Sequence, residues 1–330
     1  MTDQVRGAAI DCGTNSIRLL IGDVDPASGR ITDLERRMEI VRLGQGVDRT
    51  GRLAPEALER TLAACTEYAA TVRAHGVPTD RIRFVATSAS RDAENRDVFV
   101  DGVREVLGVP PEVITGEEEA TLSFVGAAGE LAGRPGFTPP YLVLDIGGGS
   151  TEFVLGDIDV PAAGLRADVR ASRSVDMGCV RLTERHLLRD GQLADPPSAE
   201  LIAAMTADID AGLDLAAERV PLTETHTLVG LAGSVTTVAA IALDLPGYDS
   251  DAIHHSRLPV ERVREITERL LTATHAERAA IPVMHPGRVD VIGAGALVLL
   301  RAMERTGAAE VVVSEHDILD GILLSAARTS

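Results

Sequence analysis

Residues 10–25 read IDCGTNSIRLLIGDVD, and residues 144–159 read LDIGGGSTEFVLGDID. The second stretch repeats the first, with Asp145 lying 134 positions after Asp11. Each copy has an apolar run, an Asp-x-Gly turn and a second apolar run, which predicts a β-hairpin with a polar tip. The identities continue beyond the turn, so a chance likeness of two glycine-containing turns is a weak explanation. The repeat therefore predicts two related domains that open with the same hairpin.

Helical and strand patterns alternate between and after the two hairpins. Apolar residues at helical spacing predict a helix that begins near Pro55 and ends near Gly76. Further helices are expected over residues 99–106, 117–131 and 198–219. Strands are expected over residues 81–87, 113–115, 169–175, 227–231 and 311–313. The Gly- and Pro-rich residues 133–140 predict a linker, and the whole pattern is typical of an α/β protein.

The composition excludes several classes of function. The chain has 330 residues, a length typical of about two domains. Its net charge of −18 argues against general electrostatic binding of DNA, RNA or an anionic membrane. All 32 basic residues are arginine, so Schiff-base, P-loop and kinase-type lysines are excluded. Aromatic residues make up only 2%, which also disfavours base stacking.

The cysteines and the apolar runs bear on the cellular compartment. Cys12, Cys65 and Cys179 are odd in number and far apart, which disfavours a disulfide framework or a cysteine zinc site. Residues 1–7 carry no apolar signal core. The longest apolar run, residues 291–300, is shorter than the about 20 residues that span a bilayer. The sequence therefore predicts a soluble cytoplasmic protein.

The tips of the two hairpins have the composition of phosphate-binding loops. Their glycines let the backbone approach a ligand closely, successive N–H groups can form an anion-binding concavity, and hydroxyl groups add donors. A single loop of this kind is as well explained by a tight turn. Two copies favour two phosphate loops that face each other across a cleft. The candidate phosphate-binding residues are Gly13, Thr14, Asn15, Ser16, Gly147, Gly148, Gly149, Ser150 and Thr151.

Acidic residues beside the loops predict a divalent cation. Asp11, Asp145 and Glu152 offer hard oxygen ligands suited to Mg²⁺, or to Mn²⁺, bridging carboxylate and phosphate. The alternative for the two aspartates is turn chemistry, because aspartate commonly bonds to the backbone of its own turn. We expect all three carboxylates to be metal ligands.

Taken together, the two hairpin tips resemble the paired phosphate motifs of the exopolyphosphatase and guanosine pentaphosphate phosphohydrolase family, within the actin-like ATPase superfamily. The resemblance extends through further motifs, which are ATSASRDAENRD (86–97), ITGEEEA (114–120), GCVRLTE (178–184), GLAGSVTT (230–237), HPGRVDVIGAGA (285–296) and SEHDILDGIL (314–323). It implies an α/β fold of two actin-like (ribonuclease H-like) domains with the active site in a cleft between them. The implied domains are residues 1–134 and 135–330, with the last helix, residues 316–328, packing back on the first.

The resemblance also implies the catalytic residues. The family's G-x-E-E-A motif matches residues 116–120, which assigns the catalytic base to Glu119 and leaves Glu118 as the alternative. Glu117 is explained by the general preference for acids at a helix N-terminus. Hydrolysis of a phosphoanhydride needs such a carboxylate to orient and deprotonate water, and Glu152 resembles the family's second acid.

Six other residues have less specific roles. Arg91 is implied as a phosphate ligand that stabilises charge in the transition state, whereas Asn95 is expected only to cap or orient. Gly233 and Ser234 open a helix after a strand, so they form either a nucleotide-side loop or a structural remnant. The pair at residues 254–255, two adjacent histidines, is interpreted as a loop or interface feature.

These observations predict an exopolyphosphatase that removes the terminal phosphate of inorganic polyphosphate with Mg²⁺ and releases orthophosphate. Short polymers are expected, because larger family members carry an additional C-terminal helical module that this chain lacks. If long polymers bind, the arginines within residues 166–189 are the first place to look for a basic track. We also expect a homodimer.

Three alternatives stay open. The first is removal of the 5′ phosphate of guanosine pentaphosphate (pppGpp), or action on other nucleoside polyphosphates. The second is a sugar or carboxylate kinase of the same superfamily, which the Gly-Glu-Glu-Glu-Ala motif disfavours. The third is a non-catalytic phosphate or alarmone sensor.

Overall fold

The two repeated stretches form the two β-hairpins that the sequence predicts. In the computed structural model, β1 (Val5–Cys12) pairs antiparallel with β2 (Ser16–Val24), and β6 (Tyr141–Ile146) pairs antiparallel with β7 (Thr151–Asp159). The register is the same in both copies, because each begins its pairing directly beside the polar tip. The predicted α/β fold class is therefore confirmed.

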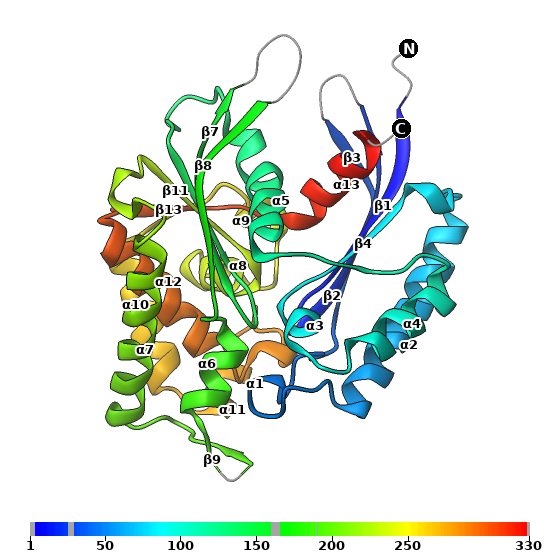
Figure 1. Cartoon of the computed structure of the whole chain (residues 1–330). Helices are drawn as coiled ribbons and strands as arrows, with labels where there is room; N and C mark the ends of the chain where they lie inside the picture. The colour runs from blue at the N-terminus through cyan, green and yellow to red at the C-terminus, as the bar shows by residue number, and fades with distance from the viewer. Residues whose placement is uncertain (1–3, 26–29, 160–165, 190, 329–330) are drawn as a thin grey trace. The chain divides into compact units, whose positions relative to one another are not determined.

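The structure describes residues 4–25, 30–159, 166–189 and 191–328. The chain divides into two compact units (Figure 1). The first unit contains residues up to Gly133, a short stretch that begins at Ile158, and the C-terminal segment from Asp317. The second contains Arg134–Asp157 and Asp168–His316.

The first unit is built on a sheet of five strands, counted over the described residues, in the order β3-β2-β1-β4-β5. The strands added to the hairpin are β3 (Ile31–Ile40), β4 (Ile82–Ala86) and β5 (Glu112–Val113). Strand β1 is apolar almost throughout, because both of its faces are covered. Ile10 faces a core shared with α2 (Pro55–Ala74) and α4 (Arg96–Leu107), whereas Ala9 faces α5 (Gly116–Ala128) and α13 (Ile318–Arg328).

The second unit has a sheet of six strands over its described part, in the order β12-β13-β11-β6-β7-β8. The strands that join the hairpin are β8 (Arg166–Val175), β11 (Thr227–Leu231), β12 (Arg257–Pro259) and β13 (Glu310–Val313). Its main helices are α6 (Cys179–His186), α7 (Ala199–Ala217), α8 (Ala232–Ala242), α10 (Val260–Thr272) and α12 (Ile292–Thr306). Their apolar faces and the sheet share one core.

Short elements complete both units. The short helices are α1 (Val47–Thr50), α3 (Ser88–Asp92), α9 (Ser250–Ile253) and α11 (His275–Ala279). A small hairpin of β9 (Leu188–Arg189) and β10 (Gln192–Leu193) follows α6. Within the described ranges, no helix is both long and apolar enough to cross a membrane.

Local patterns missed the long strand β3 and the short strands β9, β10 and β12, and they misjudged the end of one helix. Strand β3 carries charged residues on both faces, because it lies at the edge of its sheet and is largely exposed; it therefore lacks the alternation that predicts a strand. The helix expected over residues 117–131 ends at Ala128 and continues as a 3₁₀ turn, Gly129–Leu131. The helices expected from Pro55 and over 198–219 are confirmed as α2 and α7.

Two glycines let α5 and α13 pack backbone against backbone. A Cβ atom on Gly126 of α5 would overlap the carbonyl oxygen of Asp317, and one on Gly321 of α13 would overlap the carbonyl oxygen of Leu122. This approach brings Asp317, the residue that precedes α13, close to the helix that begins at Gly116.

We expect Gly126→Ala and Gly321→Ala each to destabilise the protein by about 1–3 kcal/mol, the usual penalty for overpacking. In a helix with no close neighbour the same change is normally stabilising. The sign of the change in the free energy of unfolding therefore tests the close contact between α5 and α13. The measurement is urea unfolding of the full chain. Gly247→Ala is the control, because a Cβ there meets no atom within 4 Å; its stability should stay within about 0.5 kcal/mol. Stability equal to the control in both variants would contradict the packing.

Candidate active site

The first hairpin tip uses its carbonyl groups to bind the chain that follows β3. Gly44 N donates to Thr14 O (2.9 Å), while Val41 N and Arg42 N donate to Asn15 O (3.1 and 2.9 Å). Within the described residues, the N–H groups of Thr14 and Asn15 donate no hydrogen bond. The loop is thus held from its carbonyl side, and its N–H groups are left for a ligand.

The second tip is held in the same way by a different element. The N–H groups of Cys179, Val180 and Gly178, at the start of α6, donate to the carbonyl oxygens of residues 147–149 at 3.0, 2.8 and 3.2 Å. The N–H groups of residues 148 and 149 find no acceptor in the described part of the chain. Both tips therefore present successive unpaired N–H groups, the arrangement that forms an anion-binding concavity.

Glycines that the sequence reading did not single out make these supports possible. A Cβ on Gly44 would collide with Thr14, and a Cβ on Gly178 would collide with the backbone of Gly148. Gly178 is the first residue of the quoted motif GCVRLTE (178–184). The sequence around Gly44 contains no motif that would have indicated its role.

Hydroxyl groups of the two tips differ in what they contact. Thr14 Oγ1 shares a hydrogen bond of 2.9 Å with Ser88 Oγ of α3. Ser150 is buried at the second tip. Thr151 is fully buried and donates to Met177 O (2.8 Å), so its hydroxyl holds the loop's shape.

The acid of the first loop is paired with an arginine. Asp11 lies opposite Arg18 in the hairpin register, and its Oδ2 accepts from Arg18 Nε (3.0 Å) and Nη2 (2.6 Å). Arg18 Nη1 also donates to Asp317. Burial raises the pKa of Asp11, and the charge of Arg18 opposes that rise. Asp11 Oδ1 is buried without a hydrogen-bond partner among the described residues, so this oxygen could serve a bound cation.

The acid of the second loop is paired with another acid. Asp145 lies opposite Glu152 across β6 and β7, and both are buried, with 7% and 1% of their surface exposed. Glu152 Oε1 accepts from Ser174 Oγ at 2.8 Å. Two buried carboxylates side by side repel each other unless a proton or a cation intervenes. The all-oxygen donor set fits a hard divalent cation such as Mg²⁺.

Glu119 lies in the first turn of α5 and points toward Arg91 of α3. Its Oε2 accepts from Arg91 Nη1 (3.2 Å), and the same nitrogen donates to Ile114 O (3.0 Å). Thr115 caps the helix by accepting from Glu118 N, and the helix N-terminus favours negative charge there. Since α3 also carries Ser88, this short helix links Glu119 to the first loop.

Glu118 has a different environment. Its side chain is 46% exposed and forms an ion pair with Arg83 (2.9 Å), which also pairs with Glu112. This geometry favours Glu119 over Glu118 as the base.

Asn95 ties two chain segments together rather than pointing at the loop. Its Oδ1 accepts from Leu53 N (2.8 Å) and its Nδ2 donates to Leu53 O (3.0 Å). It therefore has an orienting role.

Gly233 and Ser234 begin α8 as expected, but an arginine covers them. Arg288 Nη1 donates to Gly233 O and to Thr237 Oγ1, both at 3.1 Å, and a Cβ on Gly233 would overlap the guanidinium group. Ser234 is buried against Gly295.

The two adjacent histidines make local contacts within the second unit. His254 Nδ1 accepts from Glu315 N (3.1 Å), and His255 Nδ1 lies 2.9 Å from Arg134 Nη1. The two rings stack with centroids 3.6 Å apart.

The sequence reading missed Arg18, Asp317 and Ser174. Arg18 could have been predicted from the hairpin alone. Counting the same number of residues back along β1 and forward along β2 from the turn places Arg18 opposite Asp11. Asp317 and Ser174 come from distant segments, and no local pattern connects them to the loops.

Comparisons with known proteins find relatives along nearly the whole chain. Residues 20–330 match the Ppx/GppA phosphatase family. A Mycobacterium tuberculosis (strain ATCC 25618 / H37Rv) protein named exopolyphosphatase 2 is 50% identical over 98% of this chain and 98% of its own length. A Vibrio parahaemolyticus protein named guanosine-5′-triphosphate,3′-diphosphate pyrophosphatase is 31% identical over 90% of this chain, but this match covers only 54% of that protein.

Solved structures are also similar to this chain along nearly its whole length. The crystal structure of an exopolyphosphatase-like protein superposes with a TM-score of 0.89 at 42% identity, covering 98% of each chain. An Aquifex aeolicus member of the Ppx/GppA family superposes with a TM-score of 0.76 at 28% identity, covering 99% of this chain and 98% of that one.

Proposed function

This chain belongs to the Ppx/GppA phosphatase family, and we propose that it is an exopolyphosphatase that hydrolyses the terminal phosphate of inorganic polyphosphate. The observation that carries the proposal is the ion pair between the buried Glu119 and the half-buried Arg91, which α3 links through Ser88 to the first loop. A carboxylate and a guanidinium group beside a phosphate-binding loop are the groups that phosphoanhydride hydrolysis requires.

Glu119 acts as the general base. It orients a water molecule and removes its proton as the oxygen attacks the terminal phosphorus. The new P–O bond forms while the bridging P–O bond breaks, so orthophosphate leaves and the polymer becomes shorter by one unit. Arg91 stabilises the charge on the transferred phosphoryl oxygens, because its guanidinium group is already held in place by Ile114 O.

The two hairpin tips bind phosphate. The N–H groups of residues 14–15 and 148–149 donate no hydrogen bond within the described ranges, and the carbonyl groups of the tips are engaged by residues 41–44 and by the start of α6. Such preorganised donors bind an anion without a further change of the loop.

In the second unit, Asp145 and Glu152 would hold Mg²⁺. In the first unit, Asp11 Oδ1 is a buried oxygen that could bind a cation. When bound, the ion neutralises phosphate charge and polarises the bond that breaks. Ser174 orients Glu152 by donating to its Oε1. Mn²⁺ has the same preference for oxygen ligands and is the alternative ion.

The choice of polyphosphate over pppGpp rests on the relatives. The relative that matches along nearly its full length is named exopolyphosphatase 2, whereas the pyrophosphatase relative matches over half of its length. Because the chain carries a net charge of −18, long polyanions meet repulsion outside the binding loops, which favours short polymers. The homodimer and the cytoplasmic location stay predictions.

The direct test measures orthophosphate released from tripolyphosphate, longer polyphosphates, pppGpp and ATP, each with Mg²⁺. We expect the polyphosphates to give the highest kcat/KM. Preference for pppGpp would replace the proposed substrate by the alternative. Tight binding without release of phosphate from any of them would indicate a sensor.

Glu119→Gln should lower kcat by about 10²–10⁴, because the amide keeps the size of the side chain and cannot take a proton. Binding of the substrate should be retained. Glu118→Gln is the matched control and should keep wild-type turnover, since Glu118 is paired with Arg83 on the surface. A reversal of the two results would move the base to Glu118.

Asp145→Asn and Glu152→Gln should each shift the Mg²⁺ activation curve to higher concentration by about tenfold or more, because each removes a charged ligand. Asp157→Asn, on the same hairpin, is the control, because Asp157 pairs with Arg170 (2.9 Å). Activation curves that coincide for wild type and both variants would show that the acidic pair does not bind the ion.

A further inference from the structure

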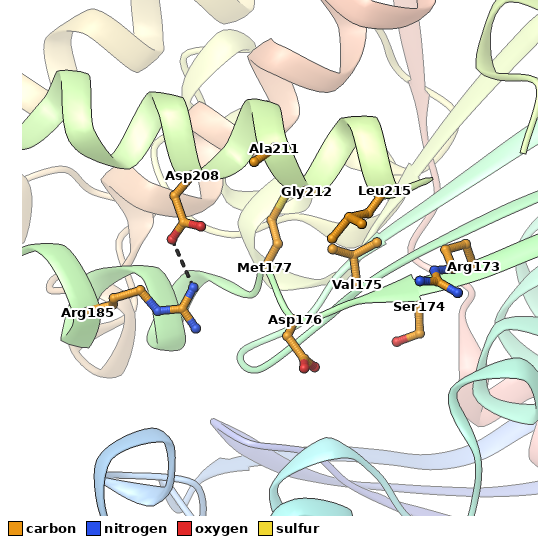
Figure 2. Close-up of a pocket in the computed structure, with 10 residues that line it drawn as sticks. All are labelled: Arg173, Ser174, Val175, Asp176, Met177, Arg185, Asp208, Ala211, Gly212 and Leu215. Atoms are coloured by element: carbon orange, nitrogen blue, oxygen red, sulfur yellow. Dashed lines mark hydrogen bonds and ion pairs between the residues drawn. The ribbon is translucent and has the colours of Figure 1, made fainter. Parts of the chain in front are cut away.

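The second unit contains a hollow of about 320 Å³, and Ser174 is the one lining residue to which the proposed function gives a role. It lies between the end of β8, residues 176–177, α6 and α7 (Figure 2). Arg173 and Ser174 lie at one end, and Arg185 and Asp208 lie at the other. Apolar and small residues complete the lining, which are Val175, Met177, Ala211, Gly212 and Leu215.

The charges at the far end of the hollow neutralise each other. Arg185 Nη1 lies 2.9 Å from Asp208 Oδ2, and His186 Nε2 lies 2.7 Å from the same oxygen. Asp176, on the open side, is 68% exposed and lies 3.8 Å from Arg181, so solvent and this arginine weaken its field.

Arg173 is the cation of the lining that has no acceptor. Its Nε is buried and finds no hydrogen-bond partner, and its guanidinium group forms no ion pair within the described residues. Its neighbour on β8, Arg170, is paired with Asp157. A buried donor without a partner is costly, and the half-buried guanidinium group lines the hollow, where an anion could bind it.

One residue of the hollow's lining also contacts the acidic pair of the second loop. Ser174, which follows Arg173 in β8, both lines the hollow and donates to Glu152 Oε1. A polymer whose terminal phosphate is bound near Glu152 therefore has an adjacent space for its next units, with one unpaired guanidinium group inside it.

We propose that this hollow is a subsite for an internal phosphate of the polyphosphate chain, with Arg173 as the residue that binds it. The inference rests on the proposed function. The planar guanidinium group can bind two oxygens of one phosphate, which suits a repeating phosphate chain. The subsite would place a local positive charge for the polymer on a surface that is negative overall.

The test compares Arg173→Gln with wild type over a series of polyphosphates from tripolyphosphate upward, with Mg²⁺. We expect KM to rise by about 10- to 100-fold for chains long enough to reach the hollow. The value of kcat should change little, since the contact is not made to the reacting phosphate. Arg173→Lys should recover part of the loss, because it keeps the charge without the fork.

Arg170→Gln is the matched control, because Arg170 lies on the same strand and is already paired with Asp157. It should leave KM unchanged at every chain length. A KM for Arg173→Gln equal to that of wild type at every length would overturn the inference, as would an equal loss in Arg170→Gln.

A second measurement does not depend on activity. Tripolyphosphate and longer polyphosphates, added without Mg²⁺, should raise the Tm of wild type more than the Tm of Arg173→Gln. If no polyphosphate is hydrolysed but this difference is found, the subsite stands and the proposed function fails. If polyphosphate is hydrolysed and the difference is absent, the proposed function stands and the subsite fails.

Discussion

The cross-strand partner of each loop aspartate is the constraint on which the candidate site depends. The same register places Arg18 opposite Asp11 and Glu152 opposite Asp145. The first pairing joins opposite charges and leaves one buried carboxylate oxygen, Asp11 Oδ1, without a hydrogen bond from the described part of the chain. The second joins two buried acids, an arrangement that favours a cation. The same hairpin thus supplies two different electrostatic environments. The difference arises at one equivalent position, which holds Arg18 in the first copy and Glu152 in the second.

Around these hairpins, the supporting elements engage the carbonyl side of each loop. In the first unit that support is the segment after β3, and in the second it is the start of α6. The two supports differ in structure, yet both leave the loop N–H groups for an anion. The short helix α3 adds the link between the first loop and Glu119, through Ser88 and Arg91. The arrangement suits hydrolysis of a phosphoanhydride, as the family membership also indicates.

The sequence predicted the features that repeat along the chain or that show a local pattern of apolar residues. It did not predict the contacts between residues that are distant in the sequence. The hairpins and the helices α2 and α7 have clear local patterns, and Glu119 was placed by its motif. Strand β3 was not predicted, because an exposed edge strand does not need an apolar residue at every second position. Asp317 contacts Arg18 from 299 positions away, and Arg173 differs from its paired neighbour Arg170 only in what surrounds it. Such contacts depend on the tertiary fold, which no window of sequence contains.

The position of α13 has a consequence for synthesis on the ribosome. Ile318, Ile322 and their neighbours cover a face of the first sheet that includes Ala9 and Leu20. That helix is made after the whole of the second unit. At a synthesis rate of about 5–20 residues per second, roughly 10–40 s pass before α13 is made and can cover this face of the sheet. During that time an apolar face stays open to chaperones, and Arg18 lacks the carboxylate of Asp317. The surroundings of the first phosphate loop are therefore among the last parts of the nascent protein to be completed.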